Sequence, residues 1–149
     1  MKREETVDFH IRSAWHAISR MYNQQAAEYD ATMSVGFALL VIDTEDGIPA
    51  TKIAPMMGLE VRSLTRILKS LEDKKLITRV SDKSDKRSVR ICLTKKGKEK
   101  RELAKETVVL FNEAVRNEIS QSKLNVFFEV IQQINKLAEK NNIYEKIHS

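Results

Sequence analysis

The sequence predicts a mainly α-helical chain that carries one small β hairpin, and three observations support this fold class. Only four glycines and two prolines occur among 149 residues, which favours helices over an all-β sandwich. Apolar residues recur at helical spacing along most of the chain. The alternation of polar and apolar residues that marks a half-buried strand is confined to residues 76–93. Length and an apolar content of 42% fit a single globular domain over residues 1–149.

The first third of the chain is predicted to form two helices. Apolar side chains at helical spacing indicate one helix over residues 5–29. The stretch Asp30-Ala31-Thr32 ends it, and Thr32 is a suitable N-cap for the next helix. Residues 33–43 are mostly apolar, so the second helix should be buried on most sides.

The next segment has the spacing of two helices joined by a tight turn. After a turn-rich loop over residues 44–49, a short helix over 51–57 is expected, capped by Thr51. Pro55 should lie in or just after its first turn, and Gly58 should end it in the left-handed conformation. The following helix runs from about residue 60 to 75. Its apolar positions follow the i, i+3, i+4, i+7 rule: Leu64, Ile67, Leu68 and Leu71.

Two strand-like runs follow, and then two further helices. Residues 76–81 and 88–93 alternate and are joined by the charged loop DKSDKR, which predicts a hairpin. Thr94 is a suitable N-cap for a helix over 95–118, and a last helix is expected over about 123–140.

This order of elements is that of a winged helix-turn-helix. Only about three residues separate the helices on either side of Gly58, and a hairpin follows directly. Residues 33–94 are therefore expected to form a DNA-binding lobe. The helices within 1–30 and 95–149 carry apolar positions that so small a lobe cannot bury. A second copy of the chain would cover them, so we expect dimerisation helices in these two segments.

The charge distribution points to a polyanionic partner for the middle of the chain. Residues 51–101 hold 16 lysines and arginines against 6 acidic residues, a net charge of +10. The remaining residues hold 10 against 15, a net charge of −5. A surface with uneven, solvated charge is the alternative, but such asymmetry is typical of proteins that bind nucleic acid.

In a winged helix-turn-helix, the second helix enters the major groove and the hairpin loop contacts the backbone or the minor groove. The outward face of the second helix offers Arg62, Ser63, Arg66 and Lys69. Arg87 at the loop tip suits the minor groove, with Asp85 holding its side chain in position. Three more wing residues are expected along the phosphates: Lys83, Lys86 and Arg90. The alternative is that Asp85 and Arg87 form an ordinary exposed ion pair.

The segments IAPMMGLEVRSLTRILKSLEDKKLITRV and SDKSDKRSVRICLTKKG resemble the winged-helix core of the MarR family of bacterial transcription regulators. The wing match rests on Asp85, Arg87, Leu93, Thr94 and Gly97. The resemblance implies a homodimer on a pseudo-palindromic operator, acting as a repressor, and it adds Thr65 to the DNA-reading stretch. Leu59-Glu60 departs from the family, which often has Ser or Thr at this point. A winged-helix module for protein–protein contacts, with non-specific DNA affinity, is the alternative function.

The resemblance also implies a small-molecule effector that binds between the dimerisation helices and the DNA-binding lobe. The residues expected there are Trp15, His16, Met33, Phe37 and Phe111. These side chains either line such a pocket or simply pack in the core and dimer interface. The second interpretation is favoured, because aromatic and methionine side chains at helical spacing are usually core residues.

Other classes of function find little support in the sequence. There is no glycine-rich phosphate loop and no nucleophile motif, so neither an enzyme nor a cofactor is expected. His10, His16 and His148 lack the spacing of zinc ligands, so no metal is expected. Cys92 is the one cysteine, and neither a signal peptide nor a membrane span is recognisable. A cytoplasmic location is the corresponding expectation.

Overall fold

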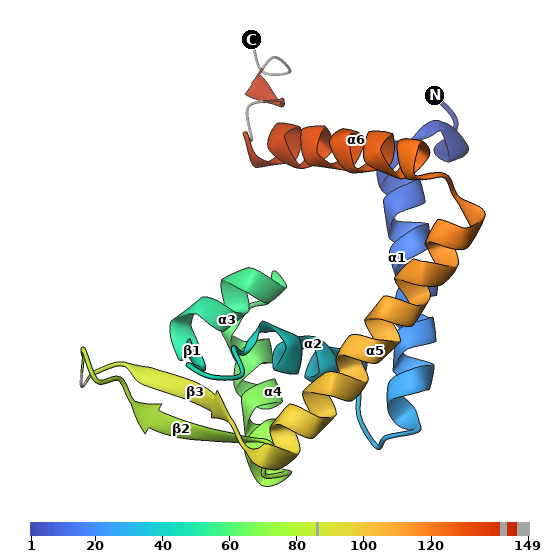
Figure 1. Ribbon diagram of the computed structural model, residues 1–149. Coiled ribbons are helices and arrows are strands. Elements are labelled where there is room, and N and C mark those ends of the chain that lie inside the picture. The colour runs from blue at the N-terminus through green and yellow to red at the C-terminus, as the bar shows by residue number, and fades with distance from the viewer. Residues whose placement is uncertain (86, 141–142, 146–149) are drawn as a thin grey trace. The chain divides into compact units, whose positions relative to one another are not determined.

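A computed structural model describes residues 1–85, 87–140 and 143–145 (Figure 1). It divides into two compact units, Met1–Val108 and Val109–Ser149. The fold is mainly α-helical with a small antiparallel sheet, and this confirms the fold class expected from the sequence. Within the described residues, no helix is long and apolar enough to cross a membrane.

The elements follow the expected order, with boundaries within a few residues of those predicted. They are η1 (Arg3–Glu5), α1 (Val7–Ala27), α2 (Met33–Val41), β1 (Ile48–Pro49), α3 (Ala50–Met57), α4 (Val61–Asp73), β2 (Ile77–Ser81), β3 (Val89–Leu93), α5 (Lys95–Glu118) and α6 (Gln121–Glu139). Two of the predicted N-caps are confirmed. The Thr32 hydroxyl accepts a hydrogen bond from the Val35 amide, and the Thr94 hydroxyl accepts one from the Gly97 amide.

The core of the first unit lies between α2, α3, α4 and the sheet (Figure 1). Helix α4 contributes Leu64, Leu68 and Leu71, whose spacing places them on one face of the helix. The remaining members come from α2, α3, the sheet and the residues beside them: Val35, Ala38, Leu39, Ile42, Ile48, Ile53, Ala54, Leu76, Ile77 and Ile91. Burial on one face of α4 leaves its opposite face to solvent.

The sheet has three strands rather than the two that were predicted, in the order β1-β3-β2. Ile48 pairs with Ile91 and Pro49 with Arg90, in antiparallel register. A strand of two residues is too short to show an alternating pattern, which explains why the sequence did not reveal it. Pro49 fits here because β1 is an edge strand, where a missing N–H costs least.

Helix α3 differs from the prediction at its start. It begins at Ala50 with Pro49 as N-cap, so Thr51 is not the capping residue. Pro55 lies inside the helix just after its first turn, within the expected range, and lacks the N–H that would donate a backbone hydrogen bond. Burial of Ile53 and Ala54 supports this short helix. Gly58 ends it at φ 63°, in the left-handed conformation that was expected.

The junction between α4, β2 and α5 is tightly packed. Lys75 adopts φ 59° just after α4, and the Leu76 amide donates to the Leu71 carbonyl over 2.9 Å. The Thr94 hydroxyl donates to the Lys75 carbonyl over 2.7 Å. A Cβ on Gly97 would lie 1.9 Å from the Leu76 carbonyl oxygen, so the first turn of α5 requires glycine at this position. A displacement of the first turn of α5 at this junction would therefore also displace the end of α4.

The second unit contains the last part of α5 and helix α6. Ser120 caps α6 by accepting a hydrogen bond from the Lys123 amide, and the helix begins two residues before its predicted start. Many large apolar side chains of this unit are exposed: Val109, Leu110, Ile119, Val126, Phe127, Phe128, Val130, Leu137, Ile143 and Tyr144. So much exposed apolar surface is typical of a protein–protein interface.

Candidate functional site

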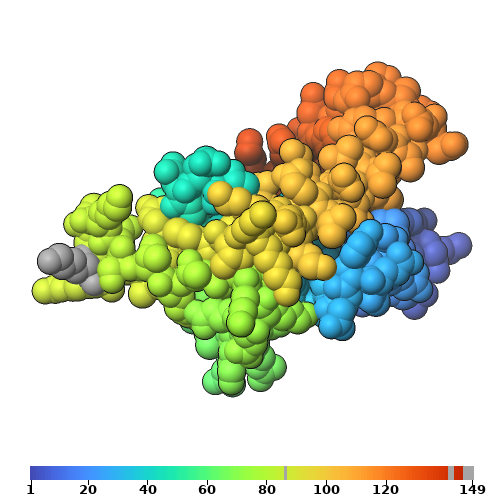
Figure 2. Space-filling view, turned by 60° about the horizontal axis from the view of Figure 1, so that its bottom comes forward, coloured from blue at the N-terminus to red at the C-terminus, as the bar shows by residue number. Residues whose placement is uncertain are grey.

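Helix α4 presents a polar, basic face to solvent. Arg62, Ser63, Arg66 and Lys69 are all exposed, on the side away from the buried leucines. The residues expected to read DNA therefore share one face, as their spacing of three and four residues requires. Figure 2 shows α4, in green, projecting from the surface, with the yellow-green wing extending to one side as an arm.

The first turn of α4 adds a residue that the sequence analysis did not single out. Val61, the first helical residue, is 74% exposed although it is apolar. Thr65 lies one turn later, and its hydroxyl donates to the Val61 carbonyl over 3.0 Å. Glu60 is the N-cap but makes no capping hydrogen bond through its side chain. The signal for Val61 was its position directly before Arg62, at the start of a predicted recognition helix.

The tip of the wing is shaped by Asp85, which binds backbone rather than a guanidinium. Its carboxylate accepts hydrogen bonds from the Arg87 amide over 3.0 Å and from the Ser88 hydroxyl over 3.2 Å. The Ser88 amide in turn donates to the Asp85 carbonyl. The expected link between Asp85 and the Arg87 side chain is thus a link to the Arg87 backbone. Asp85 closes the turn and leaves the Arg87 side chain in solvent.

The cationic side chains of the wing fall into two groups. Lys83 and Arg87 are exposed, and neither side chain has a hydrogen bond or ion pair among residues 1–85, 87–140 and 143–145. Lys86, expected to contact phosphate, lies outside the described residues. Arg79 on β2 pairs with Glu72 of α4 through a hydrogen-bonded ion pair, which connects the wing to α4.

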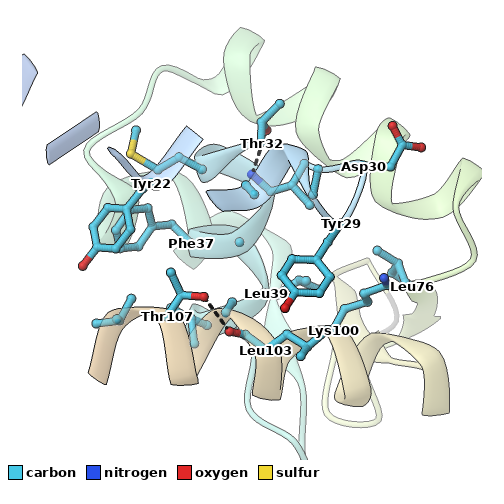
Figure 3. Close-up of a pocket in the computed structure, with 18 of the residues that line it drawn as sticks. Tyr22, Tyr29, Asp30, Thr32, Phe37, Leu39, Leu76, Lys100, Leu103 and Thr107 are labelled. Atoms are coloured by element: carbon cyan, nitrogen blue, oxygen red, sulfur yellow. Dashed lines mark hydrogen bonds between the residues drawn. The ribbon is translucent and has the colours of Figure 1, made fainter. Parts of the chain in front are cut away.

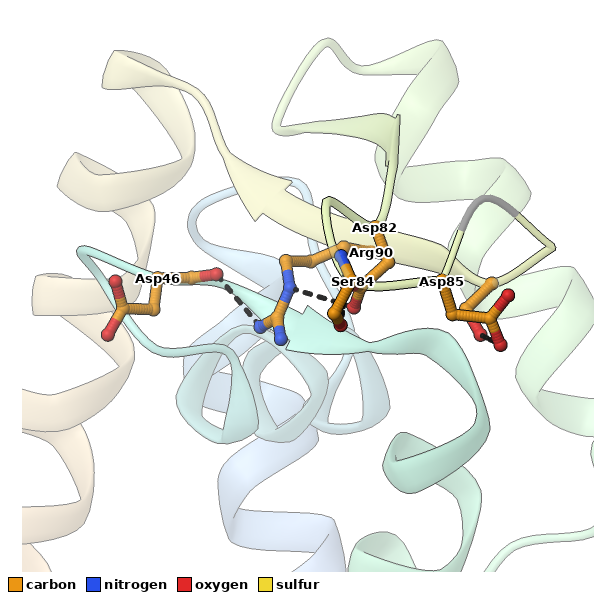
Figure 4. A network of polar contacts seen from close by, with 6 residues as sticks. Asp46, Asp82, Ser84, Asp85 and Arg90 are labelled. Atoms are coloured by element: carbon orange, nitrogen blue, oxygen red, sulfur yellow. Dashed lines mark hydrogen bonds and ion pairs between the residues drawn. The ribbon is translucent and has the colours of Figure 1, made fainter.

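Arg90 was expected to lie along the phosphates, but its guanidinium has partners inside the protein (Figure 4). Its Nη1 donates to the Asp46 carbonyl over 3.0 Å, and its Nε lies 3.5 Å from Oδ2 of Asp82. The other carboxylate oxygen of Asp82 accepts from the Ser84 hydroxyl and amide, over 2.6 and 2.9 Å. These bonds from Ser84, with a smaller contribution from the Arg90 charge, hold the pKa of Asp82 below its usual value.

A cavity of about 280 Å³ lies within the first unit (Figure 3). Its wall is mainly apolar, and its lining residues come from α1, α2, the loop between them, the residues just after α4 and the first half of α5. They include Tyr22, Tyr29, Met33, Gly36, Phe37, Leu40, Leu103, Ala104 and Thr107. Tyr22 and Phe37 meet edge to face with ring centroids 5.7 Å apart, and burial raises the pKa of Tyr22. The volume is near the lower end of the range for small-molecule sites, roughly 300–1,000 Å³.

The charged residues that line this cavity are mostly lysines. Lys74, Lys96 and Lys100 line it together with one acidic residue, Asp30. Lys74 Nζ donates to the Asp30 carbonyl over 2.8 Å, and Lys96 Nζ lies 3.4 Å from the Lys74 carbonyl. Lys100 Nζ lies 5.7 Å from the centre of the Tyr29 ring. The excess of cations makes the cavity suitable for an apolar molecule with one anionic group.

Of the residues expected to form an effector pocket, two line the cavity and three do not. Met33 and Phe37 are lining residues. Trp15 and His16 are exposed on α1, about two turns before Tyr22, and Phe111 belongs to the second unit. The difference arises because α2 packs on the later part of α1, where the Asn23 side chain accepts a hydrogen bond from the Met33 amide. Tyr22, Tyr29 and the lysines were missed, since the position of that packing is not a local property of the sequence.

No group of three or more His, Cys, Asp or Glu side chains within the described residues is arranged to hold a metal ion. Cys92 is a free, partly buried thiol on β3. The sulfur lies close to Gly47, where a Cβ would approach it to 2.8 Å.

Comparison with known proteins agrees with this geometry. The model of the MarR family matches residues 32–89, which include α2 to β2 and the wing loop. The HTH-type transcriptional regulator SarZ of Staphylococcus aureus (strain USA300) is 33% identical over 97 residues. That alignment covers 64% of this chain and 66% of SarZ, just under two thirds of the relative's length.

Two solved structures share the fold over most of the chain. The S. aureus MepR–DNA complex has a TM-score of 0.79 at 22% identity, covering 88% of this chain and 97% of MepR. The PcaV transcriptional regulator from Streptomyces coelicolor, solved with its natural ligand, has a TM-score of 0.79 at 18% identity, covering 93% and 97%. The family model, the SarZ relative and the winged-helix geometry agree, and all three show that this chain is similar to the MarR family of winged helix-turn-helix transcription regulators.

Proposed function

We propose that this protein is a sequence-specific DNA-binding repressor that acts in the cytoplasm as a homodimer. One observation carries the proposal: the exposed basic face of α4 and the exposed cations of the wing belong to the same compact unit. Asp82 and Asp85 of the wing loop bind Ser84, Ser88, Arg90 and the Arg87 amide, so among the described residues neither forms an ion pair with the Lys83 or Arg87 side chain. MepR, which shares the fold, was solved in complex with DNA.

In this proposal, the start of α4 reads bases in the major groove. Arg62 and Arg66 have the side chain that pairs in bidentate fashion with guanine O6 and N7. Val61, exposed one position earlier, offers an apolar contact for a thymine methyl group. Ser63, Thr65 and Lys69 would contact bases or phosphates from the same helix.

The wing would contact the flanking backbone and minor groove. The Arg87 guanidinium, exposed at the loop tip, suits the negative potential of a narrow minor groove. Lys83 would neutralise phosphate, and Lys86 is retained as a phosphate contact on sequence grounds alone. Asp85 contributes by fixing the turn that carries Arg87.

A homodimer accounts for the exposed apolar surface. In the second unit Phe127, Phe128 and Leu137 on α6 are at least 41% exposed, and on α1 Val7 and Trp15 are each 51% exposed. A second copy that covers these residues would place two α4 helices and two wings on one duplex. The matching operator would be pseudo-palindromic, because operator symmetry mirrors protein symmetry.

The cavity supports a second proposed property, release from DNA by a small effector. We infer an effector with an apolar body and one anionic group, which would seat on Lys74, Lys96 and Lys100. Lys74 directly follows α4, so a ligand that draws Lys74 from the Asp30 carbonyl would disturb the end of the recognition helix. PcaV, which shares the fold, was solved with its natural ligand.

The DNA-binding proposal is tested with a duplex from upstream of the protein's own gene. Wild type, Arg87→Ala and Lys105→Ala would be titrated by fluorescence anisotropy, Lys105 being an exposed lysine outside α4 and the wing. Loss of the wing contact should weaken binding about tenfold to a hundredfold, while Lys105→Ala binds like wild type. Circular dichroism would establish that both variants fold. Equal affinity of Arg87→Ala and wild type would refute the wing contact.

The alternative function, a protein–protein module with incidental DNA affinity, makes a different prediction. Its binding would depend on salt but not on sequence, because phosphate contacts alone carry no sequence information. Random duplex would then compete as well as the upstream duplex. That result would favour a search for protein partners.

The effector proposal is tested with benzoate and its neutral analogue benzamide as probes. Benzoate at millimolar concentration should raise the melting temperature and lower DNA affinity, whereas benzamide should do neither. Lys100→Met, which keeps the length of the side chain and removes its charge, should abolish the benzoate effect. Equal responses to the two probes would refute an anion-binding role for the lysines.

A further inference from the structure

We propose that Arg90 is a positioning residue that clamps the wing to the turn between α2 and β1, and that Arg90 acts on DNA affinity through the wing's geometry rather than by touching phosphate. This inference depends on the proposed DNA-binding function. It departs from the interpretation of Arg90 as one more cation of the wing, and it assigns Asp82 a supporting role. The contacts that carry it are drawn in Figure 4.

Arg90 lies at the point along β3 where the pairing with the third strand, β1, ends. Pro49, the last residue of β1, pairs with Arg90, while β2 and β3 continue as a pair as far as Ser81 and Val89. A two-stranded ribbon without further support is marginally stable in water. The loop beyond it therefore needs a side-chain link back to the body of the unit, and Arg90 stands at the position where that link is needed.

On one side, Arg90 holds the base of the wing loop. Its Nε lies 3.5 Å from Oδ2 of Asp82, while Oδ1 of Asp82 accepts two hydrogen bonds from Ser84. The Asp82 amide donates to the Ser88 carbonyl over 3.0 Å and closes the loop. Asp82 thus binds Ser84 through its carboxylate and Ser88 through its backbone amide, and the same carboxylate pairs with the Arg90 guanidinium. The Asp82 side chain is only 12% exposed, so this pairing is shielded from solvent more than a surface ion pair.

On the other side, Arg90 is anchored to a turn that is itself well fixed. Its Nη1 donates to the Asp46 carbonyl. Within that turn, the Asp43 carboxylate accepts from the Glu45 and Asp46 amides over 2.9 and 2.7 Å. Arg101 of α5 donates to the Ile42 and Leu40 carbonyls, both over 3.2 Å, just before the turn. The wing is therefore connected through Arg90 to the turn and through Arg101 to α5.

Both contacts use different nitrogens of one planar group. A guanidinium can point Nε at a carboxylate and Nη1 at a carbonyl at the same time, which the single ammonium of lysine cannot do. The Arg90 side chain is 30% exposed, and reaching a phosphate would require it to leave Asp82 or Asp46. Lysine at this position would preserve the charge but not the clamp.

A wing that acts only through its charge and a wing that Asp82 holds in position predict opposite effects of Asp82→Asn on DNA affinity. If the wing acts only through charge, removing a carboxylate beside DNA strengthens binding. If Asp82 positions the wing through Arg90, the same change weakens selective binding about tenfold, the cost of one lost specific contact. Glu45→Gln is the matched control, because it removes one exposed carboxylate from the neighbouring turn and leaves the clamp intact. It should bind no more weakly than wild type.

Two variants at Arg90 complete the test. If Arg90 holds the wing in position, Arg90→Lys and Arg90→Ala should both weaken DNA binding by about tenfold. The slope of log affinity against log salt should then stay that of wild type. A phosphate contact would instead be rescued by lysine, and Arg90→Ala would lower the slope by about 0.9 per contact. Rescue by lysine together with tighter binding of Asp82→Asn would overturn the proposal.

A measurement without DNA separates this proposal from the proposed function. Hydrogen exchange of the segment 82–90 should become about tenfold faster in Asp82→Asn and Arg90→Lys, with α4 unchanged, because the links that hold the loop are lost. Unchanged exchange would overturn the clamp even where wild type binds DNA selectively. Absence of selective binding by wild type would contradict the proposed function and leave the exchange result to decide the clamp.

Discussion

Gly47 and Gly58 have nearly the same backbone conformation but different surroundings, and alanine at each should have different consequences. Their φ angles are 66° and 63°, in the left-handed region that costs an L-residue about 1–2 kcal/mol. Apart from Gly58 and its two chain neighbours, no atom of the described residues lies within 4 Å of the position that a Cβ would take, so Gly58→Ala should cost only that backbone term. This substitution serves as the control for the second one.

At Gly47 the added carbon has no room. Its Cβ would lie 2.3 Å from the Ile91 carbonyl oxygen and 2.8 Å from the Cys92 sulfur, so β3 would have to move. Overpacking of this kind costs about 1–3 kcal/mol beyond the backbone term. Gly47→Ala should therefore lower the free energy of unfolding by about 2–5 kcal/mol in total. It should also loosen the pairing of β1 with β3 at the base of the wing.

Urea unfolding of both variants, at a single protein concentration because a dimer's stability depends on it, would test this reasoning. We expect Gly47→Ala to be less stable than Gly58→Ala by about 1–3 kcal/mol, with similar m-values. Equal midpoints for the two variants would refute the steric argument and leave only the shared backbone cost.

Three further predictions concern the core, acid stability and the cavity. Leu71→Ala removes a fully buried α4 side chain and should cost about 2–5 kcal/mol in urea unfolding; a smaller loss would mean that the core collapses around it. Hydrogen bonds lower the pKa of Asp43 and Asp82, so their stabilisation holds above the unfolded value of about 3.9 and disappears as pH falls through the lower folded pKa. Asp43→Asn should therefore lose less stability than wild type between about pH 5 and pH 3, and equal losses would contradict this. Ala104→Phe should fill the cavity, abolishing the benzoate response while DNA binding persists; a retained response would place the ligand elsewhere.

The helix-turn-helix could be predicted from the sequence because its signals are local. The spacing of Leu64, Leu68 and Leu71 identifies the buried face of α4, and the same spacing assigns Arg62 and Arg66 to the exposed face. Gly58 marks a left-handed turn within a few residues of both helices. The buried face of α4 and the turn at Gly58 depend only on residues one or two helical turns away, and both are present in the structure.

Features that depend on distant contacts could not be predicted in the same way. The Asp46 carbonyl that binds Arg90 lies 44 residues away in sequence, so the charge of Arg90 alone suggested phosphate. Strand β1 is defined by its pairing with β3 rather than by its own two residues. The residues proposed for an effector pocket included Met33 and Phe37, which line the cavity, but the packing of α2 on α1 adds Tyr22 and Tyr29 rather than Trp15.

The arginines and lysines of the wing that the structure describes fall into two groups, those with partners among the described residues and those without. Arg79 and Arg90 are used within the protein, to Glu72 and to Asp82 and Asp46. Lys83 and Arg87 are exposed and form no ion pair within the part of the chain that the structure describes, and the proposed function assigns them to DNA. Counting every cation of the wing as a phosphate contact would therefore overestimate the salt dependence of binding.

The measurement that tests the central claim most directly is competition between specific and random DNA for the wild-type protein. The protein would be bound to a labelled duplex from upstream of its own gene at about 150 mM salt, and unlabelled duplexes would be added while anisotropy is followed. A sequence-specific regulator predicts that random duplex displaces the label only at an excess of about a thousandfold or more over the unlabelled upstream duplex. Displacement by both duplexes at the same concentration would contradict the account, because only the non-specific attraction of charges would then remain.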